Sequence, residues 1–300
     1  MNPRDTRRAG GFVLAGCAAL LFASKGLFVK ILAARGVDYL TMTMVRGLLA
    51  LPLYAGLALW RGVQLRRMPP RVLALAGLAG ALGYGVGALV DFRALELIDV
   101  SVERALLFTY PALIVCWRAL ARRRWPRPAV LAALAATYGG ILLVVGGFNA
   151  ALWRQNLTGA LLVLTCAACM ACYFVLGERS IAVLGSAGFT LVGLSAAAAF
   201  VLAAFLCARP VAPIGMLDAR DWLLLMALAV LCMFLPTVFQ AGAISRIGAE
   251  RGALASTIGP PAALLLGVLL LGERPDLWQL LGTALIVAGI VLIARARPER

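Results

Sequence analysis

The chain has no histidine, and only 14% of its 300 residues carry a charge. Enzymes that work inside a membrane need paired carboxylates, histidine clusters or an activated nucleophile. No apolar run of this sequence holds a carboxylate pair, and no glycine-rich phosphate loop of the Walker type is present. We therefore expect a protein that is not an enzyme, binds no metal or cofactor, and is not driven by its own ATP hydrolysis.

Polar surface is scarce as well, because 63% of the residues are hydrophobic and the mean hydropathy is +0.96. Soluble domains are about half apolar and about a quarter charged. The net charge of +15 comes from arginines that cluster in short polar breaks, such as residues 61–67 and 122–127. Such clusters are typical of the cytoplasmic ends of membrane helices. The sequence thus predicts the lipid bilayer as a partner, and no nucleic acid.

All seven cysteines lie inside apolar runs, so no disulfide framework is expected. Cys166, Cys169 and Cys172 share the spacing of a cluster-binding triplet. The run lacks polar flanks, a fourth thiol close by, and histidine. We interpret the three cysteines as small helix-packing residues.

A membrane helix needs about 20 mostly apolar residues. Runs of this length predict ten spans, at residues 11–33, 39–60, 71–91, 101–121, 128–147, 157–177, 187–207, 221–242, 251–271 and 277–294. The first run follows three arginines as a signal sequence would, but it is longer than the apolar core of one, so we expect a retained helix. The prediction is an all-α polytopic membrane protein with very short loops.

The loop charges indicate the orientation. If the N-terminus lies inside, the inner segments carry about twice as many basic residues as the outer ones, with residues 122–127 the richest inner loop. By the positive-inside rule, both termini are predicted to be cytoplasmic.

An internal repeat emerges when the sequence is shifted by 149 positions. The shift aligns Pro111 with Pro260, Pro126 with Pro275, and Gly140 with Gly289, without a gap between residues 94–145 and 243–294. Each half then holds five helices, an odd number, so the second copy must be inverted in the membrane. The loop at residues 272–276 has a charge of −1, whereas its partner at 122–127 is strongly basic, as inversion requires. We predict two inverted five-helix repeats, residues 1–147 and 148–300, of the kind that builds transporters.

Several segments resemble the EamA domain of the drug/metabolite transporter superfamily. In the second half these are residues 252–260, Leu270-Leu271-Gly272-Glu273-Arg274, Gly282 and Gly289-Ile290-Val291-Leu292; in the first half they are residues 24–30, 46–50, 110–112 and 138–141. Arg123-Arg124-Trp125-Pro126 departs from the Gly-Glu-Arg element of the family. The resemblance, which covers nearly the whole chain, implies a ten-helix EamA-type exporter in the bacterial inner membrane, similar to exporters of aromatic and neutral amino acids.

Candidate site residues are the polar and aromatic residues within the spans, since polar groups there are costly without a partner. The predicted substrate-binding set is Ser24, Lys25, Tyr84, Thr109, Tyr110, Tyr173, Phe239, Gln240, Ser256 and Thr257. Pro111, Pro236 and Pro260 are predicted hinges or gates, because proline frees a backbone carbonyl one turn earlier. Packing within the bundle is the alternative for the prolines and the aromatic residues.

The charged candidates do not decide how transport is driven. Lys25 is predicted to hold a substrate carboxylate; the alternatives are an ion pair with Asp91 or Glu96, or a position at the outer interface. Arg46 is expected to reach that interface. Asp91 and Glu103 are placed near span ends, so no proton relay at the membrane centre is predicted, and facilitated export, exchange and proton antiport all stay open.

These observations predict a secondary transporter that exports small metabolites, above all neutral or aromatic amino acids, by alternating access. With both repeats in one chain, it is expected to work as a monomer. An exporter of drugs or other metabolites and a channel are the alternatives. An inverted repeat favours two alternating faces over a symmetric pore.

Overall fold

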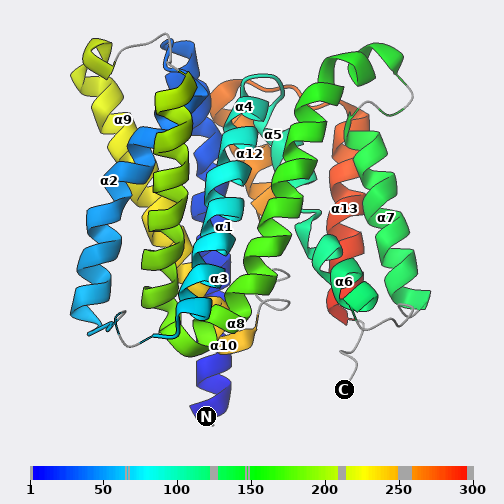
Figure 1. The fold of residues 1–300 in the computed structure, drawn as a ribbon. Coiled ribbons are helices and arrows are strands. Elements are labelled where there is room, and N and C mark those ends of the chain that lie inside the picture. Colours follow the sequence, from blue (N-terminus) through cyan, green and yellow to red (C-terminus); the bar gives the residue numbers. More distant parts are fainter. Residues whose placement is uncertain are drawn as a thin grey trace.

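The computed structural model describes residues 3–64, 66, 68–121, 128–145, 147, 149–208, 214–248 and 259–295, and this part of the chain is helical without strands. The helices are α1 (Pro3–Ala34), α2 (Tyr39–Trp60), α3 (Pro70–Gly80), α4 (Gly87–Leu95), α5 (Val100–Leu107), α6 (Tyr110–Ala121), α7 (Pro128–Val145), α8 (Ala150–Ala208), α9 (Ala219–Ala229), α10 (Leu235–Ile247), α12 (Gly259–Leu271) and α13 (Leu277–Arg295). A short 3₁₀ turn, Ile214–Met216, precedes α9. α1 begins and α13 ends at the same end of the bundle (Figure 1).

Helix α8 contains a reversal of the chain. Gly185 lies inside it with φ 69° and ψ 169°, a backbone conformation that glycine adopts without steric cost. The rings of Tyr173 and Phe189 lie 5.3 Å apart, although sixteen residues of straight helix would separate their backbones by about 24 Å. The chain therefore folds back on itself at Gly185, and α8 runs through the bundle in both directions.

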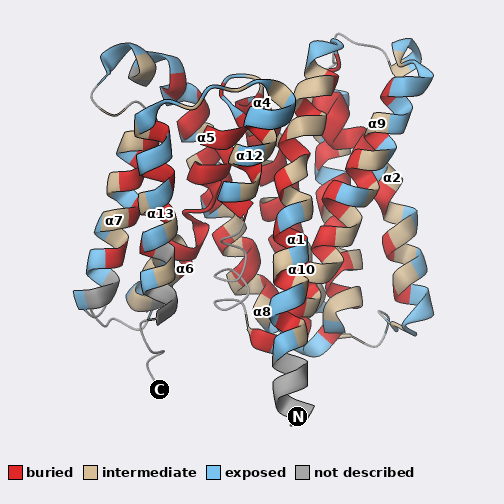
Figure 2. Ribbon diagram, turned by 180° about the vertical axis from the view of Figure 1, so that it is seen from behind, coloured by how far each residue is buried: buried red, intermediate tan, exposed pale blue. Residues whose placement is uncertain are grey.

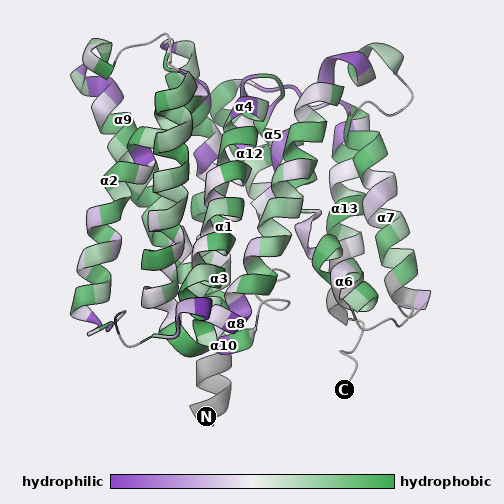
Figure 3. Ribbon diagram, viewed as in Figure 1, coloured by the Kyte–Doolittle hydropathy of each residue, from purple (hydrophilic) through white to green (hydrophobic). Residues whose placement is uncertain are grey.

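The outside of the bundle is apolar. Large hydrophobic side chains such as Leu59, Trp60 and Leu120 are more than three-quarters exposed. Hydrophilic residues gather mainly at the two ends (Figure 3). In the described part of the chain, six helical stretches are long and apolar enough to cross a membrane, and three shorter apolar helices accompany them. An exposed apolar surface of this extent would not be stable in water, so lipid must cover it. The protein is a polytopic membrane protein.

Helix boundaries recur at the spacing of the internal repeat. α3 begins at Pro70 and α9 at Ala219, while α7 begins at Pro128 and α13 at Leu277; both pairs are 149 residues apart. Two π-helical turns have the same spacing, since one begins at Ala81 and the other 149 residues later at Val230. A π-turn widens the helix by one residue and is uncommon. Its recurrence at this spacing shows that the two segments are bent in the same way.

Close contacts between α7 and α13 have a two-fold pattern. A Cβ atom on Gly140 would overlap the backbone of Gly282, and one on Gly289 would overlap the carbonyl oxygen of Ala133. Because Gly140 is 149 positions before Gly289, and Ala133 is 149 positions before Gly282, each contact is the counterpart of the other. Small residues at these positions let the two helices lie directly against each other (Figure 1).

The core lies where the two halves of the chain meet. α1 packs on α10 and α12, whereas α8 packs on α3, α4 and α5, so each half contributes a helix to the other. Buried residues concentrate along these inner faces (Figure 2). Any pocket at the centre is therefore built from both halves.

Two polar clusters fix the helix ends. The carboxylate of Glu273 accepts hydrogen bonds from the backbone N–H groups of Val100 (2.7 Å) and Ser101 (3.3 Å), and thereby caps α5 from the other half of the chain. Asp218 and Asp221 form a capping box at the start of α9, and Arg35 bonds to both carboxylates. The backbone N–H of Asp221 and the guanidinium of Arg35 lower the pKa of Asp218.

Candidate substrate pocket

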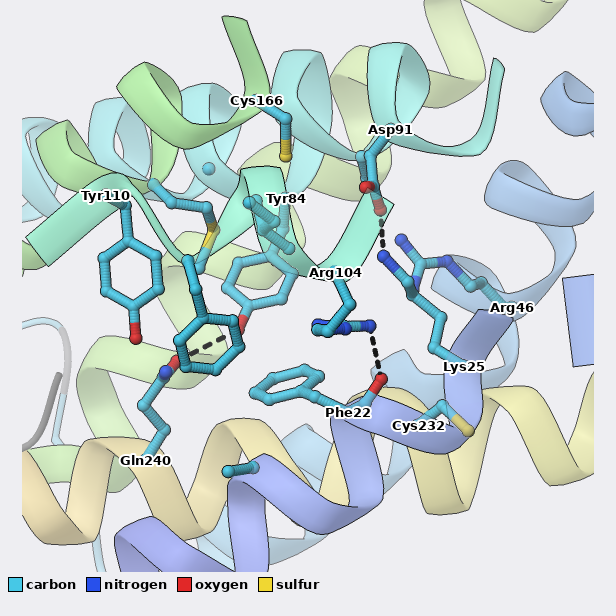
Figure 4. Close-up of a pocket in the computed structure, with 16 residues that line it drawn as sticks. Phe22, Lys25, Arg46, Tyr84, Asp91, Arg104, Tyr110, Cys166, Cys232 and Gln240 are labelled. Atoms are coloured by element: carbon cyan, nitrogen blue, oxygen red, sulfur yellow. Dashed lines mark hydrogen bonds and ion pairs between the residues drawn. The ribbon is translucent and has the colours of Figure 1, made fainter. Parts of the chain in front are cut away.

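A small cavity of about 60 Å³ lies at the centre of the bundle. Figure 4 shows it from within. It is lined by residues of both halves: Ala19, Phe22, Lys25, Arg46, Gly83, Tyr84, Ala88, Asp91, Arg104, Leu107, Phe108, Tyr110, Cys166, Met170, Cys232 and Gln240. Pockets that hold a small molecule usually measure about 300 Å³ or more. The cavity in this structure is thus smaller than a typical substrate pocket.

One side of the pocket is charged. The ammonium of Lys25, on α1, donates hydrogen bonds to Asp91 on α4 and to Glu103 on α5, the latter over 3.3 Å. Arg104 donates to the backbone carbonyl of Phe22 (2.6 Å) and lies 3.7 Å from the second carboxylate oxygen of Glu103. All four charged residues are at most 6% exposed. Burial of this kind is costly unless the charges are paired, so the network determines how α1, α4 and α5 approach each other.

Arg46 completes the charged side. It comes from α2, is 3% exposed, and stacks on the ring of Phe92 with its guanidinium carbon 4.3 Å from the ring centroid. The Lys25 ammonium lies 5.8 Å from the same centroid, so the two cations share one aromatic surface. Among the described residues, Arg46 makes no ion pair, and its Nε atom has no hydrogen-bond partner.

The opposite side of the pocket is neutral and aromatic. The hydroxyl of Tyr84 donates to the side-chain oxygen of Gln240 over 3.2 Å. The ring of Tyr84 meets that of Tyr173 edge to face at 5.0 Å. Tyr84 lies on the π-turn at Ala81–Val86, and Cys232 lies on the turn at Val230–Phe234, so both π-turns present a residue to the pocket. Gln240 and Asp91 are 149 positions apart, so one repeat position carries an amide and the other a carboxylate.

The structure brings together four of the predicted site residues: Lys25, Tyr84, Tyr110 and Gln240 line one pocket. Three others are near it without lining it. Ser24 donates to Leu21 and lies 3.4 Å from Cys232; Tyr173 packs on Tyr84; Thr109 precedes Tyr110.

The remaining candidates lie elsewhere. Phe239 is half-buried and does not line the pocket, while Ser256 and Thr257 lie outside the described residues. Pro111, Pro236 and Pro260 each occupy the second position of a helix, α6, α10 and α12 respectively. Proline is compatible with the first turn of a helix, as at Pro111. Pro236 directly follows the π-turn Val230–Phe234 within the continuous helical stretch Ala219–Ile247.

The expectation that Arg46 reaches the interface is wrong, because this residue is buried at the pocket. Asp91 and Glu103 lie near the ends of the helical stretches Pro70–Leu95 and Val100–Ala121, as predicted, and the structure shows in addition that they are buried ion-pair partners. The alternative of an ion pair between Lys25 and Asp91 is confirmed, and Lys25 also pairs with Glu103. Glu96 instead accepts hydrogen bonds from Arg93 and from the backbone N–H of Tyr39. Arg104, which belongs to the predicted span at residues 101–121, also lines the pocket. The adjacent Glu103-Arg104 pair inside an apolar stretch was the signal that pointed to burial.

A membrane bundle of apolar helices around a closed, charged pocket defines the class of polytopic transport proteins. Comparison with known proteins identifies the family. The EamA-like transporter family matches residues 9–146 and again residues 157–295, so this chain belongs to that family. It is a transporter of the drug/metabolite transporter superfamily.

Similar proteins come from bacteria. The chain is 31% identical to the uncharacterized transporter YcbK of Bacillus subtilis over 283 residues, which are 91% of this chain and 89% of YcbK. It is 29% identical over 218 residues to the threonine/homoserine exporter RhtA of Salmonella typhimurium, covering 69% of this chain and 68% of RhtA. A solved crystal structure matches with a TM-score of 0.68 at 22% identity, over 95% of this chain and 96% of the other. That likeness shows the fold alone.

Proposed function

We propose that this protein exports neutral amino acids, or metabolites of similar size and charge, across the bacterial inner membrane by alternating access. The observation that carries the proposal is the closed pocket with a charged and a neutral side, enclosed between two halves of one chain. An amino acid has charged groups at one end and a side chain at the other, and the two sides of the pocket match this division. The name of RhtA, a threonine/homoserine exporter, supports the same substrate class.

The closed pocket also supports alternating access. A cavity of about 60 Å³ is too small for an amino acid, so helices must separate before one can enter. The regular α-helical backbone is interrupted at three places where such a movement could occur: the two π-turns, and the break at Phe108 and Thr109 between α5 and α6. π-turns are frequent at functional sites in helices. Pro111 and Pro236 begin the helices that follow two of these interruptions, and we propose them, with Pro260, as hinges.

The proposed architecture has ten membrane crossings in two inverted repeats, residues 1–147 and 148–300. If α8 counts twice because it reverses at Gly185, the six long stretches and three shorter helices amount to ten crossings. The double match of the family and the two-fold contacts of α7 and α13 support the repeats. With an even number of crossings both termini lie on one side, which the arginine distribution assigns to the cytoplasm. Alkaline phosphatase fused to either terminus should be inactive in cells; an active fusion would contradict this orientation.

Counterflow in liposomes tests the proposed function. Purified protein should take up labelled L-threonine, L-homoserine or L-phenylalanine, and unlabelled amino acid inside should stimulate the uptake. Uptake without such stimulation would indicate a channel. Failure of the whole panel with folded protein would overturn the amino-acid assignment and favour the alternative, an exporter of drugs or other metabolites.

Two tyrosines provide a matched pair for the same assay. Tyr84→Phe removes the hydroxyl that bonds to Gln240 in the pocket, and we expect the apparent affinity to fall about threefold to tenfold, the cost of one buried hydrogen bond. Tyr54 is also buried, but its hydroxyl bonds to Met233 and Thr237 away from the pocket lining. Tyr54→Phe should leave the affinity unchanged, and an equal effect of both substitutions would argue against this pocket as the binding site.

A further inference from the structure

The buried charges at the pocket do not balance. Lys25, Arg46 and Arg104 are three cations, whereas Asp91 and Glu103 supply only two carboxylates among the described residues around them. Both carboxylates already bond to Lys25, and Arg104 lies against Glu103. An unpaired charge within a membrane protein is expensive and marks a functional position. The excess is one positive charge.

Arg46 carries that excess. Among the described residues it contacts the face of Phe92, and its Nε–H donates no hydrogen bond to any carboxylate or carbonyl oxygen there. The Nε atom of Arg104 also has no hydrogen-bond acceptor. Both arginines line the cavity, and Figure 4 shows them around the same end of it as Lys25. A planar guanidinium with free N–H groups matches a carboxylate, which it can bind through two parallel hydrogen bonds.

We propose that Arg46, with Arg104 beside it, binds the carboxylate of the transported substrate, and that this carboxylate is obligatory for binding. The inference rests on the proposed function and names the chemical class of its substrate. Lys25 is unsuited to the role first predicted for it, because both of its partners are already in place. The bound carboxylate supplies the missing negative charge of the cluster.

The other end of the substrate then faces the neutral side of the pocket. Tyr84, Tyr110 and Phe22 offer aromatic surface there, and the oxygen of Gln240 has a second lone pair for a donor. An ammonium group can rest on such aromatic faces. The two carboxylates lie on the charged side and each already bonds to Lys25 through one oxygen, while their second oxygens, Asp91 Oδ1 and Glu103 Oε2, have no hydrogen-bond partner among the described residues. The ammonium is therefore dispensable for binding, in contrast to the carboxylate.

Matched acids and amides test this inference without any mutation. L-phenylalanine is compared with L-phenylalaninamide, and 3-phenylpropionate with 3-phenylpropionamide, as inhibitors of amino-acid counterflow and as stabilisers of the detergent-solubilised protein against heat in chloride-free buffer. Each acid should act at least about tenfold more strongly than its amide, the effect of charge-assisted hydrogen bonds. An amide as effective as its acid would overturn the inference, and so would equal stabilisation by chloride or no stabilisation by either acid.

Variants of Arg46 test whether this residue causes the preference for acids over amides. Arg46→Gln should lose the preference for acids over amides, and Arg46→Lys, which keeps the charge without the planar fork, should retain a weakened preference. The control is Arg93→Gln, because Arg93 is an exposed arginine of the same bundle that pairs with Glu96, and this variant should behave as the wild type. An unchanged preference in folded Arg46→Gln would contradict the assignment. If the acids stabilise the protein against heat but no counterflow is seen, the proposed transport fails while the carboxylate-binding inference stands.

Discussion

Replacing Lys25 by methionine is expected to destabilise the protein by about 3–5 kcal/mol, because Asp91 and Glu103 would remain buried without their shared cation. The side chains of both carboxylates are at most 5% exposed, so bulk water solvates them poorly once the ammonium is removed. Thermal unfolding in detergent, followed by the loss of the monodisperse peak in size-exclusion chromatography, measures the effect.

Two further variants decide whether charge is the cause. Lys30→Met removes the other lysine of α1, which is only half-buried and makes no ion pair among the described residues, and it should leave stability unchanged within about 0.5 kcal/mol. The triple variant Lys25→Met, Asp91→Asn, Glu103→Gln removes all three charges and should recover much of the loss. If Lys25→Met alone is as stable as the wild type, the network has no structural role.

The second large effect is expected for Gly80→Ala, at the crossing of α3 and α8. A Cβ atom on Gly80 would overlap the backbone carbonyl group of Gly193, which cannot turn aside as a side chain would. The two helices must then separate, at a cost of about 2 kcal/mol or more, typical of overpacked cores. Gly80 also directly precedes the π-turn that carries Tyr84, so transport should decrease together with thermal stability.

A control for this substitution lies one turn earlier on the same helix. A Cβ atom on Gly77 would lie 3.6 Å from the Cβ atom of Ala196, which is an ordinary contact. Gly77→Ala should therefore be neutral or gain up to about 1 kcal/mol through the higher helix propensity of alanine. Equal stability of the two variants would show that the close approach at Gly80 does not limit the packing.

The pocket acquires its two different sides through differences between the halves of the chain. Asp91 and Gln240 occupy positions 149 apart, yet one is a carboxylate in an ion pair and the other an amide bonded to Tyr84. Arg46 has its counterpart at Ser195 by the same spacing, so the charged side exists once. A substrate with two chemically different ends would thus enter such a pocket in one orientation only.

Much of the helical architecture followed from local composition. The predicted span at residues 39–60 coincides with α2, and the one at 277–294 differs from α13 by one residue, because a membrane helix must bond its own backbone and so needs an uninterrupted apolar run. Helices α7 and α13 begin 149 residues apart, which is the spacing of the internal repeat. The reversal within α8 was also expected, since two apolar runs flank Gly185, which lies between the predicted spans at 157–177 and 187–207.

The identity of the pocket residues was decided by tertiary structure. Arg46 lies near a predicted helix end, where an arginine normally reaches water, and nothing in its neighbourhood in the sequence distinguishes it from an interfacial residue. Whether such a side chain turns outward or inward depends on helices far away in the chain: Lys25 meets Asp91 and Glu103 across 66 and 78 residues. Hydropathy measures how well each segment dissolves in lipid, whereas the direction in which a charge points depends on how whole helices pack against one another.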